Sequence, residues 1–118
     1  MNFEHALAAR SETLIDTGLQ YRPGDTVRVR VVRRKRRISV TDDGIAIEKA
    51  GRPRRWRQAA ARVAQAVDVN ISRDGVISLP VVRVGPGEQE IVRRIANASL
   101  CLYQELLELE ELCDSATG

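Results

Sequence analysis

Aromatic residues are scarce in this 118-residue chain, which holds one Trp, one Phe and two Tyr. A core of ordinary size must therefore consist mostly of Val, Ile, Leu and Ala, and a chain of this length can bury one without disulfides or metals. No apolar run approaches the ~20 residues of a membrane-spanning helix. The first ten residues include an acid and an Arg, unlike a signal peptide. We expect one cytosolic domain, residues 1–118, with no membrane partner.

Cysteine and histidine are equally sparse. Cys101 and Cys113 fall on one predicted helix and would lie ~18 Å apart at 1.5 Å per residue. Since a disulfide requires Cα atoms within ~7 Å, we expect two reduced thiols. His5 is the single histidine, so a zinc site would lack ligands, and no recognisable nucleophile motif accompanies it. The sequence predicts no metal, no cofactor and no enzymatic activity.

Arginine, in contrast, is abundant and unevenly placed. Residues 21–62 carry fourteen cations and four acids, whereas residues 95–118 carry five acids and no cation. A basic middle and an acidic end indicate either an anionic partner or recognition between these two regions. Coding bias explains part of the number of arginines but little of their clustering.

The N-terminal half is predicted to contain a helix and a sheet. Residues 1–18 are expected to be helical over 3–17, because Phe3, Leu7 and Leu14 have helical spacing and Gly18 offers a left-handed stop. Apolar and polar residues then alternate through a basic β-meander at 26–48. Its three strands are predicted near 26–32, 38–41 and 45–48, with a turn at Pro23–Gly24 before them.

The C-terminal half is predicted to contain two helices around a hairpin. Trp56, Ala60 and Val63 begin an apolar stripe on a helix at 53–68. A second hairpin follows at 69–84, in which Pro80 indicates an edge or a bulge. Gly85-Pro86-Gly87 breaks the chain before a long helix at 88–113. The expected fold is α+β, in the order α-β-β-β-α-β-β-α, with helices packed on a mostly antiparallel sheet.

The long helix has more apolar surface than one small sheet requires. Its stripe runs from Ile91 to Cys113 and is widened by further leucines near the C-terminal end. A second subunit could cover this surplus, so we expect a homodimer, with a long core helix in a monomer as the alternative. The predicted dimer interface consists of Leu102, Leu106, Leu109 and Cys113.

The basic region is the main candidate for a binding site. Five consecutive cations are expected at a hairpin tip, and those of the neighbouring strand and helix could share its surface. Guanidinium groups suit phosphate backbones, so nucleic acid is the leading partner. An acidic protein surface and a solvated face without a role are the alternatives. The predicted anion-binding residues are Arg28, Arg30, Arg33, Arg34, Lys35, Arg36, Arg37, Arg54, Arg55 and Arg57.

Three other features allow more than one interpretation. Trp56, between arginines, could stack on a base, but its place in an apolar stripe favours the core. Asp42 and Asp43 could form a catalytic or metal-binding pair, but Asp before Gly is typical of a turn. Gly85-Pro86-Gly87 could cradle phosphate, but it lacks the Lys and the glycine spacing of a P-loop.

Residues 24–44 also carry a resemblance. The stretch Ser39-Val40-Thr41-Asp42-Asp43-Gly44 resembles a strand and turn found in small prokaryotic domains of unknown function. The resemblance covers roughly residues 14–110 and implies a hairpin and a prokaryotic or phage origin, with no activity or site residues attached to it. The function expected from the sequence is a non-enzymatic binding module for nucleic-acid backbone. The alternative is an antitoxin-like, defence or anti-defence protein that binds an acidic protein.

Overall fold

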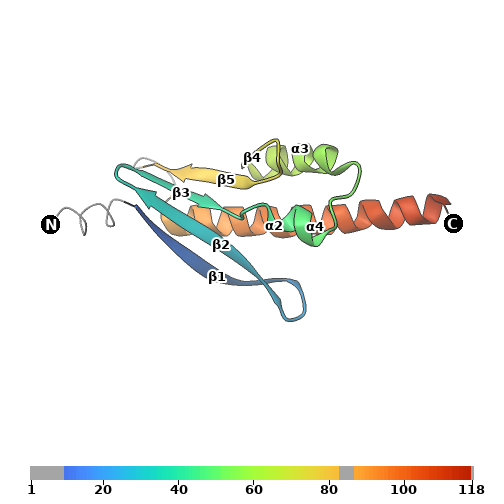
Figure 1. Ribbon diagram of the computed structural model, residues 1–118, viewed down its shortest axis with the longest axis horizontal. Helices are drawn as coiled ribbons and strands as arrows, with labels where there is room; N and C mark the ends of the chain where they lie inside the picture. The colour runs from blue at the N-terminus through green and yellow to red at the C-terminus, as the bar shows by residue number, and fades with distance from the viewer. Residues whose placement is uncertain (1–9, 83–86, 118) are drawn as a thin grey trace.

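The computed structural model describes residues 10–82 and 87–117, with side chains over 11–82 and 87–109. A five-stranded antiparallel sheet in the order β1-β2-β3-β5-β4 packs against helices (Figure 1). The predicted α+β class, the antiparallel sheet and the long C-terminal helix are confirmed. The elements are β1 (Arg10–Arg22), β2 (Asp25–Arg34), β3 (Arg37–Thr41), α2 (Ile45–Lys49), α3 (Trp56–Val67), β4 (Asn70–Ile71), β5 (Ile77–Val81) and α4 (Glu88–Thr117).

From Arg10 onward the described elements are three strands, two helices, two strands and a long helix, and two segments were assigned wrongly. Residues 10–17 belong to β1 and are not helical. Residues 45–48 belong to the short helix α2 and are not the third strand of a meander. The start of the predicted N-terminal helix, residues 3–9, lies outside the described residues.

Strand β1 forms because its inward side chains suit a sheet. Ile15 lies opposite Val29 of β2, and Thr13 lies opposite Val31. These β-branched side chains pack well on a pleated surface. A two-residue period runs through β1 from Thr13 to Tyr21, and it prevails over the helical spacing of Phe3, Leu7 and Leu14.

Helix α2 follows a turn that the side chain of Asp42 holds. The carboxylate of Asp42 accepts a hydrogen bond of 2.8 Å from the backbone N–H of Gly44, which adopts a positive φ of 74°. Ala46 and Ile47 are then both buried, although they are neighbours in sequence. Neighbouring residues on a strand point to opposite faces, so a helical turn is the conformation that buries both on this side of the sheet.

One face of the sheet is covered and the other is open. Helix α4 crosses behind β1, β2, β3 and β5, with α2 and α3 beside it (Figure 1). The covered face carries Val27, Val29 and Val31 of β2, all fully buried. Arg28 and Arg30 alternate with them and therefore lie on the open face. In the described part of the chain, no helix is long and apolar enough to cross a membrane.

The part of α4 with described side chains packs within one chain as far as Leu109. Leu102 and Leu106 are fully buried, and Leu109 packs against the same core. The predicted dimer interface is therefore wrong for Leu102 and Leu106, because α2, α3 and the sheet already cover them. The side chain of Cys113 lies outside the described residues. Helix α4 runs unbroken through positions 101 and 113. The prediction that no disulfide joins Cys101 and Cys113 assumed such a continuous helix.

Candidate anion-binding site

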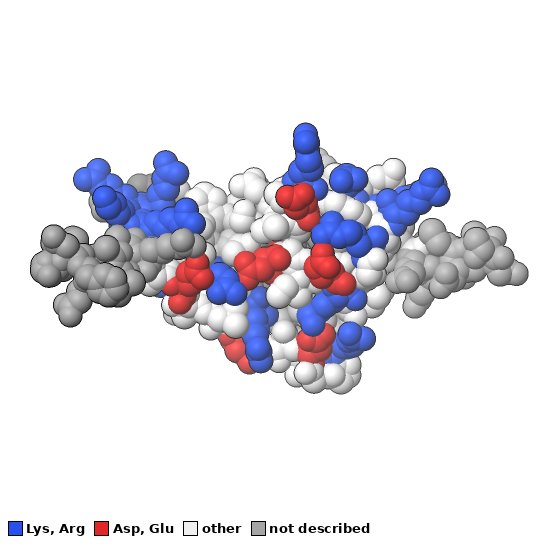
Figure 2. Space-filling model, viewed as in Figure 1, with Lys and Arg blue, Asp and Glu red and all other residues white. Residues whose placement is uncertain are grey.

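Arg34, Lys35, Arg36 and Arg37 form the turn between β2 and β3, here called the hairpin tip. Arg34 pairs with Arg37 across the hairpin, and Lys35 adopts a positive φ of 24° at the turn. All four side chains are exposed, and no carboxylate among the described side chains lies within ion-pair distance of them. Figure 2 shows Lys and Arg side chains grouped at this end of the molecule. Among the described side chains, no acid offsets the repulsion between these charges.

Arg33 stands next to the hairpin tip but serves the fold. It continues the inward row of Val29 and Val31, and its guanidinium donates a hydrogen bond of 2.5 Å to Glu88 in the first turn of α4. This ion pair joins the sheet to the start of the long helix, where an acid is also favoured by the helix dipole. Arg33 therefore already has a carboxylate partner within the chain, with 41% of its side chain exposed.

The cations in the middle of β2 lie among acids. Arg30 donates to Asp43 at 2.9 Å and to Glu12 at 3.3 Å, and the hydrogen bond to Asp43 raises the pKa of Arg30. Arg28 is exposed and lies directly opposite Asp16 of β1. The open face thus changes along β2 from mixed charges to the purely cationic hairpin tip.

A shallow hollow of ≈ 1100 Å³ adjoins the hairpin tip. Arg34, Arg36 and Arg37 contribute its charges, and Ser39 and Ser78 contribute hydroxyl groups. The remaining described lining is apolar or backbone, and no acid is among the described residues that surround the hollow. The described residues of the lining are Val32, Arg34, Arg36, Arg37, Ile38, Ser39, Ser78, Leu79, Pro80, Val81 and Val82.

Pro80 helps to leave one side of this hollow open. Asp42 donates its N–H to the carbonyl of Ile77, so in the alternating antiparallel pattern the nitrogen of Pro80 points away from β3. Strand β4 pairs only with Ile77 and Ser78, so it does not reach Pro80. The missing N–H costs no ladder hydrogen bond there, in keeping with the edge or bulge predicted from Pro80.

The structure does not bring the cations of α3 to the hairpin tip. Arg54, Arg55 and Arg57 lie at the start of α3, and Figure 2 shows a second set of cationic side chains over α2 and α3, apart from the first. Trp56 is 6% exposed, which confirms it as a core residue and leaves it unable to stack on a base. Arg57 covers its ring, with 4.9 Å between the guanidinium carbon and the ring centroid.

A buried polar cluster of Tyr21, Asp42 and Ser99 is the main feature that sequence reasoning missed. Ser99 donates to Asp42 at 2.8 Å, and the Tyr21 and Ser99 hydroxyls are 2.7 Å apart. The other carboxylate oxygen of Asp42 accepts the backbone N–H groups of Gly44 and Ile77. The three residues come from β1, the end of β3 and α4, so the cluster ties three parts of the fold together.

Burial alters the acidity of two groups in this cluster. The pKa of Asp42 is raised because loss of water disfavours its charged form, an effect that the hydrogen bonds from Ile77, Gly44 and Ser99 oppose. Burial likewise raises the pKa of Tyr21 to about 12. With Asp42 only 1% exposed, the cluster has no access for a substrate and acts as a structural element.

The other candidate sites do not assemble. Asp42 points into the core whereas Asp43 points to Arg30 on the open face, so the two carboxylates form a turn and no catalytic pair. Among the described residues, no three His, Cys, Asp or Glu side chains gather as metal ligands would. His5, Gly85 and Pro86 lie outside the described residues.

Comparison with known proteins adds no relative to this picture. No protein-family model, curated protein or solved structure matches the chain. The resemblance to small domains with a similar hairpin stays a prediction from residues 39–44.

Proposed function

We propose that this protein is a non-enzymatic module that binds the phosphate backbone of nucleic acid through its hairpin tip. The main support for the proposal is that the cations along one hairpin differ in whether they have carboxylate partners. Arg30 and Arg33 have carboxylate partners within the chain, whereas the four cations of the tip have none among the described side chains. Charges held together without internal partners gain most from an external anion.

The surroundings of the hairpin tip suit a phosphate backbone. Arg34, Arg36 and Arg37 present planar guanidinium groups that bind phosphate in a bidentate way. The hollow beside them holds hydroxyl donors and, among its described lining residues, no acid. A hairpin end is also narrow enough to approach a groove. Contacts of this kind read charge and shape, so we expect weak sequence preference.

A second candidate, an acidic protein surface, is favoured by the apolar part of the same hollow. Val82 is 53% exposed and lies beside Pro80 and Val32. An acidic protein could cover these side chains while pairing with the arginines, as an antitoxin-like or anti-defence protein would. Retention of a protein partner after nuclease treatment in a pull-down would separate this candidate from nucleic-acid binding.

The test measures affinity for mixed DNA and RNA duplexes across a salt series. If the four tip cations each contact a phosphate, log affinity should fall with log salt at a slope of about −3.6 on B-DNA. Changing Arg34, Lys35 and Arg36 to Ser, the tip variant, should reduce the slope by roughly 2 to 3 and weaken binding accordingly.

A matched control removes the same charge elsewhere. Arg54, Arg55 and Arg73 are exposed and lie at or near the α3 end, so changing them to Ser gives the α3 variant with an equal loss of net charge. The α3 variant should keep the wild-type slope. Equal losses in both variants would show that net charge, and no particular site, governs binding. If the wild-type protein does not bind nucleic acid at low salt, the proposal is overturned.

A further inference from the structure

Strand β1 is a long strand at the edge of the sheet, and part of its backbone is unpaired. In an antiparallel sheet, the backbone N–H and C=O groups of successive residues point alternately to the two neighbouring strands. The hydrogen bond from Asp42 to Ile77 shows which residues of β3 point to β5, and the strand registers carry this alternation through β2 to β1. The backbone groups of Thr13 and Ile15 therefore point to β2. Leu14 and Asp16 point theirs outward, where the described part of the chain supplies no strand. Such an edge is ready to pair with another strand.

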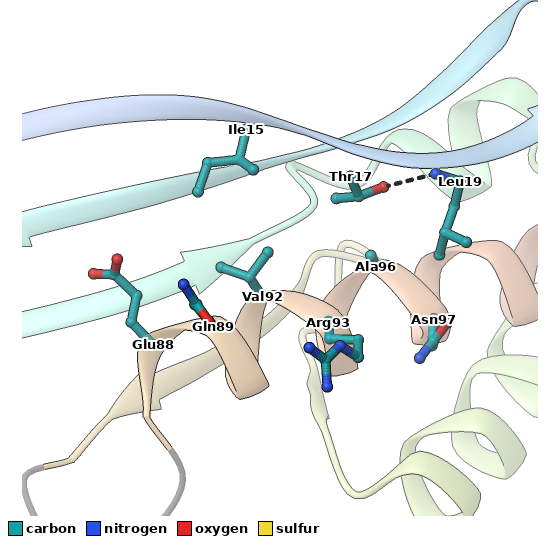
Figure 3. Close-up of a pocket in the computed structure, with 9 residues that line it drawn as sticks. All are labelled: Ile15, Thr17, Leu19, Glu88, Gln89, Val92, Arg93, Ala96 and Asn97. Carbon is teal, nitrogen blue, oxygen red and sulfur yellow. Dashed lines mark hydrogen bonds between the residues drawn. The ribbon is translucent and has the colours of Figure 1, made fainter.

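Both faces beside this edge carry uncovered apolar groups. On the open face, Leu14 is 51% exposed at the middle of the strand. On the covered face, a groove of ≈ 610 Å³ runs between β1 and α4. Figure 3 shows Ile15 and Leu19 pointing from β1 toward Val92 and Ala96 of α4, with space between them. A strand added to β1 would therefore gain apolar contacts on both of its faces.

The sequence of β1 is suited to a partner identical to itself. On the covered face of the sheet, Thr13, Ile15 and Thr17 read the same in both directions about Ile15, and Ile15 and Thr17 also line the groove. A two-fold axis through Ile15 places Ile15 opposite itself and Thr13 opposite Thr17 of the second copy, so β-branched residues pair with their own kind. We propose that β1 pairs with β1 of a second copy, with Ile15 on the two-fold axis, to form one continuous sheet.

This register satisfies both the backbone and the charges. Leu14 of each chain exchanges backbone hydrogen bonds with Asp16 of the other, and these are the residues whose groups point outward. Ile15 meets Ile15 of the second copy as a non-hydrogen-bonded pair, the type in which side chains lie closest. A register with Leu14 on the axis would instead place Glu12 opposite Asp16, two acids face to face, which is unfavourable.

Substitutions at Leu14 test the pairing without disturbing the core, because this side chain is half-exposed on the open face. In the proposed register, position 14 of each chain lies opposite Asp16 of the other chain, so the dimer contains two such pairs. Leu14→Asp should weaken dimerisation about tenfold or more relative to Leu14→Ser, through two repulsive pairs. Leu14→Lys should strengthen it relative to Leu14→Ser, through two attractive pairs. Circular dichroism of each variant confirms that the fold is retained.

Sedimentation equilibrium and amide exchange provide the readouts. The wild-type chain should approach twice its mass of 13.1 kDa as concentration rises. The Leu14 and Asp16 amides should become protected over the same concentrations, whereas those of Thr13 and Ile15 are protected throughout. If the wild-type chain stays monomeric, the proposal is overturned, and a strand of a different protein becomes the candidate partner of β1. A dimer indifferent to the charge at position 14 would also overturn it. Neither result bears on the hairpin tip as an anion-binding site.

Discussion

Strand β3 connects two regions of opposite character within five residues. At its start, Arg37 belongs to the hairpin tip, where four exposed cations have no carboxylate partner among the described side chains. Immediately after its end, Asp42 is buried and accepts hydrogen bonds from Gly44, Ile77 and Ser99. The carboxylate at the buried end has hydrogen-bond partners within the chain, whereas the cations at the exposed end have no carboxylate partner among the described side chains.

This difference separates stability from binding. A group whose partners all lie inside the chain should affect unfolding when it is changed. A group that stands in water should affect unfolding little, and its effect on a partner can then be measured without a folding artefact. The predictions below begin at the buried end and finish at the hairpin tip.

The largest effect is expected for Asp42→Ala. The change leaves the N–H groups of Gly44 and Ile77 and the hydroxyl of Ser99 without their acceptor in the core. The free energy of unfolding should fall by about 3–5 kcal/mol, as for other broken buried networks. Denaturant unfolding measures this loss. A loss below 1 kcal/mol, roughly that of a surface substitution, would contradict the structural role of the cluster.

A slightly smaller effect is expected for Gly75→Ala, in the turn that faces α2. Gly75 has a φ of 92°, and an added Cβ would lie 2.1 Å from the Cδ1 atom of Ile47 and 3.3 Å from the ring of Trp56. Backbone strain and overpacking together should cost about 2–4 kcal/mol. Gly51→Ala is the matched control for backbone strain, since Gly51 has a φ of 79° and nothing within 4 Å of an added Cβ.

Comparing wild type with Asp42→Asn isolates the acidity of the buried carboxyl. Because burial raises the pKa of Asp42, the folded state binds more protons than the unfolded state between the ordinary and raised values. Wild-type stability should therefore fall relative to Asp42→Asn as pH rises through that window, and level off above it. Unfolding measured over a pH series checks the sign. A relative gain of wild-type stability with rising pH would contradict it.

Tyr21→Phe should have a modest effect. It removes the hydroxyl that contacts Ser99 and leaves the hydrogen bond from Ser99 to Asp42 in place. A cost of about 1 kcal/mol is expected for one buried hydrogen bond between neutral groups. Denaturant unfolding beside Tyr103→Phe, in the ring that meets Tyr21 edge-on at 5.2 Å, shows whether the Ser99 contact is responsible.

The sequence predicts the fold class, the hairpin and the exposure of the hairpin tip, because alternation and turn residues carry that information locally. It fails at residues 10–17, where Leu14 points to the open face and gives the strand a false helical spacing with Phe3 and Leu7. It fails again at Ile45, because the turn before α2 depends on the hydrogen bonds that Asp42 accepts from Gly44 and from the distant Ile77. Local patterns do not contain such tertiary contacts.

The candidate site was only partly predictable for the same reason. The cluster of cations is visible in the sequence, but the carboxylate partners of Arg30 and Arg33 come from Asp43, Glu12 and Glu88. Glu88 is 55 positions away from Arg33 in the chain. The Tyr21–Ser99 contact spans 78 positions. The tertiary structure, through the pairing of β1 with β2 and the packing of α4 on the sheet, reveals which cations and which acids are engaged.

The smallest effect on stability, and the largest on binding, is expected for the tip variant with Ser at positions 34, 35 and 36. Its duplex affinity at low salt and its free energy of unfolding, measured on the same sample, test the central claim most directly. The claim predicts unfolding within about 0.5 kcal/mol of wild type together with a clear loss of affinity. Wild-type affinity in the folded variant would contradict it, because the hairpin tip would then contribute nothing to binding.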